Sequence, residues 1–257
     1  MQVAMPTAGL AAYTSRAQRA RVATETWAHE NLYCPNCNSR ELDRTPANTA
    51  ALDFICPGCA AAFQLKAQSS PFSHRIVDAA YSAMVRAIRG NATPNLFILH
   101  YDASNWTVAN VIVIPHFAFP LSAIEKRKPL GPHARRAGWV GCNILLDAIP
   151  ADAKIRVVHA GTALPRKTVR HEFARVRPLA KLDVEERGWT LDVLQEVRSL
   201  DKELFSLADV YAHEEKLSRL HPDNRHVRDK IRQQLQVLRD LGFLEFLGAG
   251  RYRLRQN

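Results

Sequence analysis

The pattern of apolar and polar positions predicts strands around one long helix in the first 182 residues. Residues 72–89 carry apolar side chains at helical spacing. Short runs rich in β-branched and aromatic residues predict strands at residues 63–67, 96–101, 108–114 and 155–159. Residues 13–31 are predicted to form the first helix. This part of the chain is therefore expected to be an α/β domain.

The remaining residues, 183–257, predict a second domain of three helices followed by a hairpin. The helix start signals are Thr190 as an N-cap, Ser206 with Asp209 as an S-x-x-D pair, and Asp223 as a cap of the third helix. Gly242 is expected to end that helix, and residues 243–254 then predict two strands around a Gly-rich turn. This order is typical of a winged helix, a variant of the helix-turn-helix.

Composition excludes several classes of protein. Of the 257 residues, 47% are hydrophobic and 23% are charged, as in ordinary globular domains. No stretch approaches the roughly 18 consecutive apolar residues of a membrane helix. Five cysteines are too few for a disulfide scaffold. We therefore expect a soluble cytoplasmic protein with reduced cysteines, no membrane contact and no obligatory protein partner, acting as a monomer.

The charge is distributed unevenly along the chain. The net charge of +10 combines +11 over residues 1–182, −6 over residues 183–218 and +5 over residues 219–257. Two basic regions separated by an acidic segment favour a polyanion, nucleic acid first. The alternative is a basic protein with an incidental pair of acidic helices, because a solvated surface can carry either sign.

Four cysteines form the strongest motif. Cys34-Pro-Asn-Cys37 is followed, after 18 residues, by Cys56-Pro-Gly-Cys59. This spacing matches the zinc pattern of paired C-x-x-C knuckles, and four thiolates close a tetrahedral site, so the zinc is expected to be structural. The alternative is a redox pair, which needs only one C-x-x-C. Cys142 is left over and is expected to be a small buried residue.

A candidate cleavage motif is interleaved with these knuckles. Asp53, Gln64 and Lys66 form the pattern D-x₁₀-Q-x-K, and the period of a strand puts Gln64 and Lys66 on one face. The pattern resembles the PD-(D/E)XK nuclease motif, in which the acidic positions bind Mg²⁺ and the lysine orients the attacking water. Glu25 is a candidate for a second carboxylate. The alternative is a solvated strand with a surface lysine.

Two further segments have the composition of DNA contacts. A loop from Lys126 to Trp139 is rich in basic residues, Pro and Gly, and its candidate contacts are Arg135, Arg136 and Trp139. The third C-terminal helix and the hairpin supply Arg228, Arg232, Gln233, Gln234, Arg251 and Arg253, of which Arg and Gln side chains can pair with guanine and adenine edges. The alternatives are a solvated loop with a core Trp, and a helix that binds protein.

These residues resemble a known family, the DpnI-type methyl-directed restriction endonucleases. The similarity runs in the same order through nearly the whole chain. The matching segments are residues 24–27, 33–37, 53–56, 63–66, 127–130, 134–144, 187–190 and 230–240. Two of them are specific, the run that ends in Asn143-Ile144 and the run from Ile231 to Asp240.

The resemblance implies an enzyme that cuts double-stranded GATC carrying N6-methyladenine. It implies a PD-(D/E)XK domain with the zinc site at 1–182 and a winged helix at 183–257 that reads the same sequence. By position, Asp53, Gln64 and Lys66 correspond to the Mg²⁺-dependent active site, and Trp139 to the methyl-reading loop. Gln64 stands where the family is expected to have Glu.

Two other functions remain open, the first of them because of Gln64. One is a reader of methylated DNA in which cleavage is weak or lost. The other is a zinc-bearing transcription regulator, which would bind one long sequence without regard to methylation and would not need Lys66.

Overall fold

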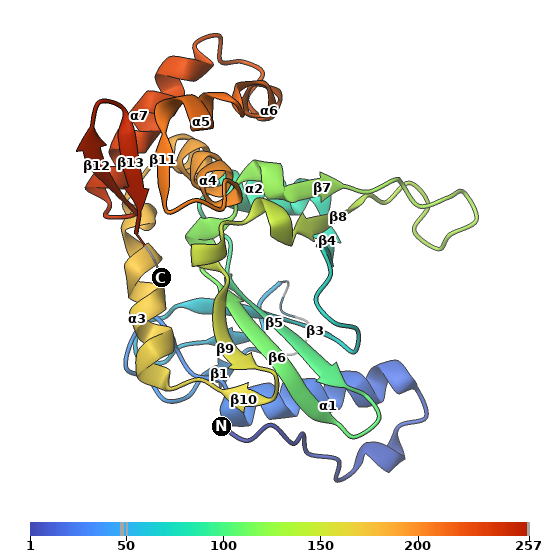
Figure 1. Cartoon of the computed structure of the whole chain (residues 1–257). Helices are drawn as coiled ribbons and strands as arrows, with labels where there is room; N and C mark the ends of the chain where they lie inside the picture. Colours follow the sequence, from blue (N-terminus) through green and yellow to red (C-terminus); the bar gives the residue numbers. More distant parts are fainter. Residues whose placement is uncertain (47–48, 50, 256–257) are drawn as a thin grey trace. The chain divides into compact units, whose positions relative to one another are not determined.

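The computed structural model describes residues 1–46, 49 and 51–255. The chain folds into two compact units (Figure 1). The first, called here the sheet unit, comprises Met1–Ile76, Ala92–His116 and Ala153–Arg175. The second, called here the helical unit, comprises Val77–Asn91, Phe117–Asp152 and Val176–Asn257. Within the described residues, no helix is long and apolar enough to cross a membrane.

The sheet unit is built on a seven-stranded sheet, counted over the residues that the structure describes. Its order is β1-β2-β3-β5-β6-β9-β10. Neighbouring strands are antiparallel except β3 and β5, which run parallel. The strands are β1 (Asp43–Arg44), β2 (Phe54–Ile55), β3 (Ala62–Gln68), β5 (Asn95–Asp102), β6 (Thr107–Ile114), β9 (Ile155–His159) and β10 (Thr162–Ala163). The predicted strands are all present.

Apolar side chains of β3 and β5 pack with the first helix to form the core of the sheet unit. The rings of Phe63 and Phe97 stack 5.2 Å apart. Helix α1 (Arg16–Asn31) lies against the sheet (Figure 1), and its Trp27 is completely buried. The indole of Trp27 donates a hydrogen bond to the carbonyl of Gln2 (2.7 Å). The predicted helix is confirmed, although it begins at Arg16 and not at residue 13.

The predicted helix at residues 72–89 is wrong in its first half. Residues Arg75–Ala80 form strand β4, and helix α2 begins only at Tyr81 and ends at Arg89. Ile76 is buried whereas Val77 is 60% exposed, an alternation that fits the period of a strand. The β-branched pair Ile76-Val77 favours this conformation locally. The helical spacing was misleading because the alanines that follow fit either structure.

The helical unit contains a winged helix. After α4 (Val184–Ser199), the elements in chain order are β11 (Leu204–Ser206), α5 (Leu207–Tyr211), α6 (Glu214–Leu220), α7 (Val227–Asp240), β12 (Leu244–Gly248) and β13 (Arg251–Leu254). The three strands form a sheet in the order β11-β13-β12. Ile231, Leu235 and Leu238 of α7 are fully buried, as the apolar stripe predicts.

The helix caps agree only in part with the prediction. The capping box of Ser206 and Asp209 is present at the start of α5. Helix α4 begins earlier than predicted, because Asp183 is its N-cap and accepts a hydrogen bond from the amide of Glu186 (2.8 Å). Thr190 lies inside α4, fully buried. The N-cap position of α7 is His226 and not Asp223.

Segments 77–91 and 117–152 also belong to the helical unit. Strands β7 (Ile124–Lys126) and β8 (Gly141–Leu145) pair antiparallel in the sheet β4-β8-β7, and their connecting loop extends away from them (Figure 1). Arg198 of α4 forms a largely buried ion pair with Asp152. The predicted division into two consecutive domains at residue 182 stays a prediction. The two compact units are each built from three separate segments of the chain.

The remaining elements are connectors. Helix α3 (Arg166–Val176) is the last segment of the chain before the helical unit resumes. Short 3₁₀ turns occupy Leu10–Ala12, His116–Ala118, Leu121–Ala123, Leu146–Ala148, Ala151–Ala153 and Arg177–Lys181.

Candidate functional site

The four predicted zinc ligands converge in the sheet unit. Their sulfur atoms all lie within 4.8 Å of one another. The Cys34–Cys59 and Cys37–Cys56 sulfur pairs are 3.6 and 3.5 Å apart. Tetrahedral zinc–sulfur bonds of about 2.3 Å place sulfur atoms about 3.8 Å apart. The cluster therefore fits a structural zinc ion, and the described residues contain no other group of three or more His, Cys, Asp or Glu side chains close enough to bind a metal.

The pKa values of two thiols in the cluster are shifted in opposite directions. Burial raises the pKa of Cys34. Burial also acts to raise the pKa of Cys56, but hydrogen bonds from Cys37 and from the amides of Gly58 and Cys59 outweigh it and lower that pKa to about 7. Cys56 therefore loses its proton more readily than Cys34. Zinc binds the thiolate form of cysteine.

Helix α3 holds the first knuckle in place. Arg170 donates one hydrogen bond to the carbonyl of Cys34 (3.2 Å) and another to the carbonyl of Ser39 (2.7 Å). The guanidinium groups of Arg166 and Arg170 lie 4.8 and 5.3 Å from the centre of the Tyr33 ring. Burial raises the pKa of Tyr33 to about 12. No local pattern in the sequence indicates the role of Arg170, because its contacts join positions more than a hundred residues apart.

The fifth cysteine lies apart from the knuckles. Cys142 is completely buried in the helical unit, and its thiol donates to the carbonyl of Ala79 (3.4 Å). The prediction of a small buried residue is confirmed.

Asp53 lies beside the strand that carries Gln64 and Lys66. Its amide donates to the carbonyl of Phe63 (2.9 Å), and its carboxylate accepts a hydrogen bond from the amide of Leu65 (2.7 Å). Leu65 is the residue between Gln64 and Lys66, which share one face of β3. All three candidate side chains are half-buried. The carboxylate is thus fixed at the level of the other two candidates along the strand.

A hollow of about 260 Å³ opens beside Asp53. Both Glu25 of α1 and Asp53 line it, together with Arg21 and Arg44. Glu25 pairs with Arg21 at 3.4 Å. The structure therefore brings the candidate second carboxylate to the same hollow as Asp53, whereas Gln64 and Lys66 do not line it.

The basic loop between β7 and β8 is closed by its own backbone. The amide of Leu130 donates to the carbonyl of Trp139, and the amide of Gly138 to the carbonyl of Leu130 (both 2.9 Å). Trp139 is half-buried, with the guanidinium of Arg136 5.0 Å from its ring centre. Gly141 is required here, since a Cβ at that position would lie 2.8 Å from the Trp139 ring. Arg135 and Arg136 are exposed.

The candidate DNA contacts of α7 divide into two groups. Arg228, Arg232 and Gln233 are exposed. Gln234 is completely buried, and its side-chain oxygen accepts a hydrogen bond from Thr190 of α4 (2.6 Å). The inclusion of Gln234 among the DNA contacts is therefore a mistake: the residue faces the core between α4 and α7.

The wing carries the last two candidates. Arg251 and Arg253 of β13 are both exposed. Arg253 is paired with Glu245 of β12 (2.9 Å), so DNA would have to compete with that carboxylate.

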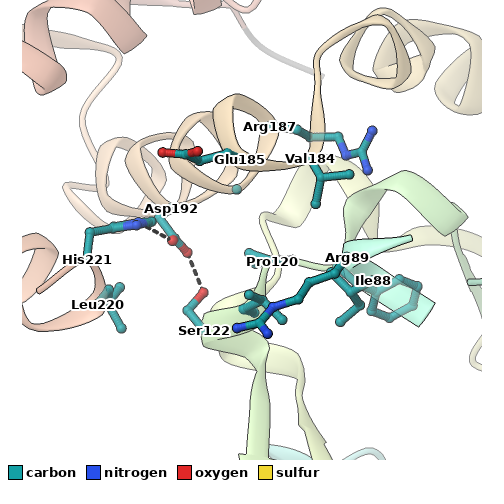
Figure 2. Close-up of a pocket in the computed structure, with 13 residues that line it drawn as sticks. Ile88, Arg89, Pro120, Ser122, Val184, Glu185, Arg187, Asp192, Leu220 and His221 are labelled. Atoms are coloured by element: carbon teal, nitrogen blue, oxygen red, sulfur yellow. Dashed lines mark hydrogen bonds and ion pairs between the residues drawn. The ribbon is translucent and has the colours of Figure 1, made fainter. Parts of the chain in front are cut away.

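A second hollow, of about 390 Å³, lies within the helical unit (Figure 2). Asp192 lies at its wall and accepts hydrogen bonds from the hydroxyl of Ser122 (2.5 Å) and from Nε2 of His221 (2.8 Å). The His221 ring stacks on Trp189 at 3.6 Å. A Ser-His-Asp hydrolase has histidine in the middle of the relay, whereas here the carboxylate is in the middle. This cluster therefore ties α4 to its neighbours and has no activated nucleophile.

Comparison with known protein families agrees with this layout. Residues 1–182 match the model of the DpnI family, described as the Dam-replacing family. Residues 185–254 match the model of its C-terminal domain, described as the Dam-replacing HTH domain. The two matches cover nearly the whole chain.

Proposed function

This chain belongs to the DpnI (Dam-replacing) family, and we propose that it cleaves double-stranded GATC whose adenine carries an N6-methyl group, with Mg²⁺ as catalytic metal. Family membership makes the protein a methylation-dependent restriction endonuclease with a DNA-binding HTH domain. The GATC target and the Mg²⁺ dependence are the parts that we propose.

The observation that carries the proposal is the anchoring of Asp53 to β3. Its carboxylate is bound to the amide between Gln64 and Lys66. One oxygen of a carboxylate can accept that hydrogen bond while the other binds a metal ion. This arrangement supports a PD-(D/E)XK site in which Asp53 and Gln64 hold Mg²⁺, an ion that takes oxygen ligands.

The bound Mg²⁺ would stabilise the negative charge that develops on the phosphate. Lys66 orients the attacking water and adds a positive charge close to the reacting phosphate. Glu25 contributes a second carboxylate from the hollow that it shares with Asp53. It thereby compensates in part for the neutral amide of Gln64, which is a weaker ligand than a carboxylate.

Methyl recognition is assigned to the β7–β8 loop and to the winged helix. Burial of one methyl group against the Trp139 indole contributes only about 0.8 kcal/mol. Strong discrimination therefore needs more than one reading of the modification. Two DNA-binding segments, each contacting both strands of a palindromic site, meet this need.

The neutral Gln64 favours a second candidate, a reader of methylated DNA that cleaves weakly or not at all. The two functions differ in product and not in binding. Cleavage has to be measured together with affinity to separate them.

The test uses two plasmid preparations that differ only in adenine methylation at GATC. Each is incubated with the full chain and Mg²⁺, and in parallel with Mn²⁺. We expect fragments from the methylated plasmid alone. A mobility shift of methylated DNA without cleavage would favour the reader, and fragments from both preparations would contradict the proposed target.

A further inference from the structure

Two arginines of α7 share one aromatic ring. Arg228 and Arg232 are one helical turn apart, and their guanidinium carbons lie 5.2 and 5.7 Å from the centre of the Tyr211 ring. Tyr211 is the last residue of α5, and α5 packs on α7. Arg228 and Arg232 are exposed residues, and Tyr211 is half-buried. This contact is not part of the apolar core, and the α7 pattern alone did not signal it.

The same Nε atom of each guanidinium is already engaged. Nε of Arg232 donates to the hydroxyl of Tyr211. Nε of Arg228 donates to the carboxylate of Glu214, the first residue of α6, at 2.7 Å. Within the part of the chain that the structure describes, the terminal nitrogens of both side chains have no partner. Each arginine is thus held from its inner side and presents its terminal pair of donors.

A terminal pair of N–H donors has a specific complement in DNA. Guanine presents O6 and N7 in the major groove, and an arginine that donates to both makes the commonest specific contact there. A long side chain loses rotamer freedom when it binds. A ring and an acceptor that fix the side chain beforehand reduce that loss, and they favour partners that match the fixed geometry.

We propose that Tyr211 is a positioning residue for guanine recognition, with Glu214 as a second anchor. Tyr211 orders Arg228 and Arg232 so that their terminal nitrogens meet guanine O6 and N7. The inference rests on the proposed function, because guanine is part of the proposed GATC target. It goes beyond that function in naming which base is read by α7 and which residues outside α7 set the geometry.

The test combines a change in the protein with a change in the base. The full chain is titrated, without added Mg²⁺, with a methylated GATC duplex and with the same duplex containing 7-deazaguanine, which lacks the N7 acceptor. The ratio of the two Kd values is the guanine penalty. We expect this penalty to become about tenfold smaller in Tyr211→Leu, since one bidentate base contact is worth about that factor.

Tyr211→Phe keeps the ring and removes only the hydroxyl that accepts from Arg232. Its guanine penalty should fall between those of the wild type and Tyr211→Leu. This variant also covers the case in which Tyr211→Leu does not fold, a point checked by thermal unfolding. An unchanged penalty in Tyr211→Phe and in folded Tyr211→Leu would overturn the proposal, as would an equal loss of affinity for every duplex, which indicates phosphate contacts only.

Glu214 and Glu215 provide a matched pair of variants. Each Glu→Ala change removes one negative charge from the first turn of α6, and Glu215 is paired with Arg219 and not with α7. Both changes should strengthen binding to any DNA to a similar extent. Only Glu214→Ala should reduce the guanine penalty. Equal penalties in the two variants would contradict the anchoring role of Glu214.

The outcome is independent of the cleavage test. An unchanged penalty together with methylation-dependent cleavage rejects the role of Tyr211 and leaves the proposed function intact. Cleavage that ignores methylation rejects the proposed function, whatever the value of the penalty.

Discussion

The zinc cluster and the candidate cleavage site are interleaved in one short stretch of chain, yet they differ in how complete they are. Cys56 and Cys59 lie between Asp53 and Gln64 in the sequence. The zinc cluster consists of four cysteines whose sulfur atoms lie within 4.8 Å of one another, a set that fits one zinc ion. The candidate cleavage site combines the carboxylate of Asp53, the neutral amide of Gln64 and the amine of Lys66, and its proposed second carboxylate, Glu25, comes from α1. The zinc cluster is a closed site, because its four ligands leave no position for a substrate, and cysteine spacing alone predicts it. The candidate cleavage site is an open site, which must admit a substrate and depends on groups that other elements bring to it.

The largest expected effect comes from breaking the closed site. Structural zinc contributes about 10–16 kcal/mol of apparent binding free energy in small domains, so Cys56→Ala should lower the Tm by at least about 10 °C. It should also abolish the binding of one zinc ion per chain. The measurement is elemental analysis together with thermal unfolding.

Cys142→Ala is the control for loss of a thiol. Cys142 lies outside the cluster, so this variant should retain one zinc ion per chain. Equal zinc content in wild type and Cys56→Ala would contradict the assignment of the metal site.

The next largest effect is expected at Lys66. Lys66→Ala should reduce the rate of cleavage about 10²–10³-fold, because a charged donor near the reacting phosphate is lost. Lys167→Ala is the control, since Lys167 is an exposed lysine on α3 of the same unit. Cleavage rates under single-turnover conditions check this, and similar rates for the two variants would remove Lys66 from the active site.

A smaller effect is expected from a change at Gln64, the neutral residue of the candidate cleavage site. Gln64→Glu restores a carboxylate to the open site, and half-maximal cleavage should then occur at an about tenfold lower Mg²⁺ concentration. Gln68→Glu adds the same charge two residues beyond Lys66, on the same face of β3. A titration of cleavage against Mg²⁺ compares the two variants. If Gln68→Glu produces the same shift, general electrostatics and not a ligand at residue 64 is responsible.

The smallest expected effect distinguishes the buried side of α7 from its exposed side. Gln234→Ala removes one buried acceptor of the Thr190 hydroxyl, which keeps the carbonyl of Glu186, and leaves a cavity between α4 and α7, so it should reduce the free energy of unfolding by about 1–3 kcal/mol. Gln233→Ala, at an exposed position, should leave stability unchanged. Chemical denaturation of both variants checks this. Equal stabilities would contradict the burial of Gln234.

The zinc ligands, the strands and the wing were predictable because each is encoded locally. Cysteine spacing fixes the knuckles, β-branched runs define strands such as β9, and the Gly-rich turn defines the β12–β13 hairpin. The Ser206 cap is likewise contained in four consecutive residues.

Other features depended on distant parts of the chain. Burial of Thr190 and its bond to Gln234 are set by the packing of α4 on α7, and no property of either residue alone indicates it. The hydrogen bonds from Arg170 to the carbonyls of Cys34 and Ser39 join residues more than a hundred positions apart. Pairing of Tyr211 with Arg228 and Arg232 likewise arises only when α5 packs on α7.

The most direct test of the account is the single-turnover cleavage rate of one GATC duplex, with and without N6-methyladenine on both strands, in the presence of Mg²⁺. We expect the wild type to cut the methylated duplex at least about 100-fold faster, the factor given by about 2.7 kcal/mol of discrimination. Equal rates on the two duplexes, or no cleavage of either at any Mg²⁺ concentration, would contradict it.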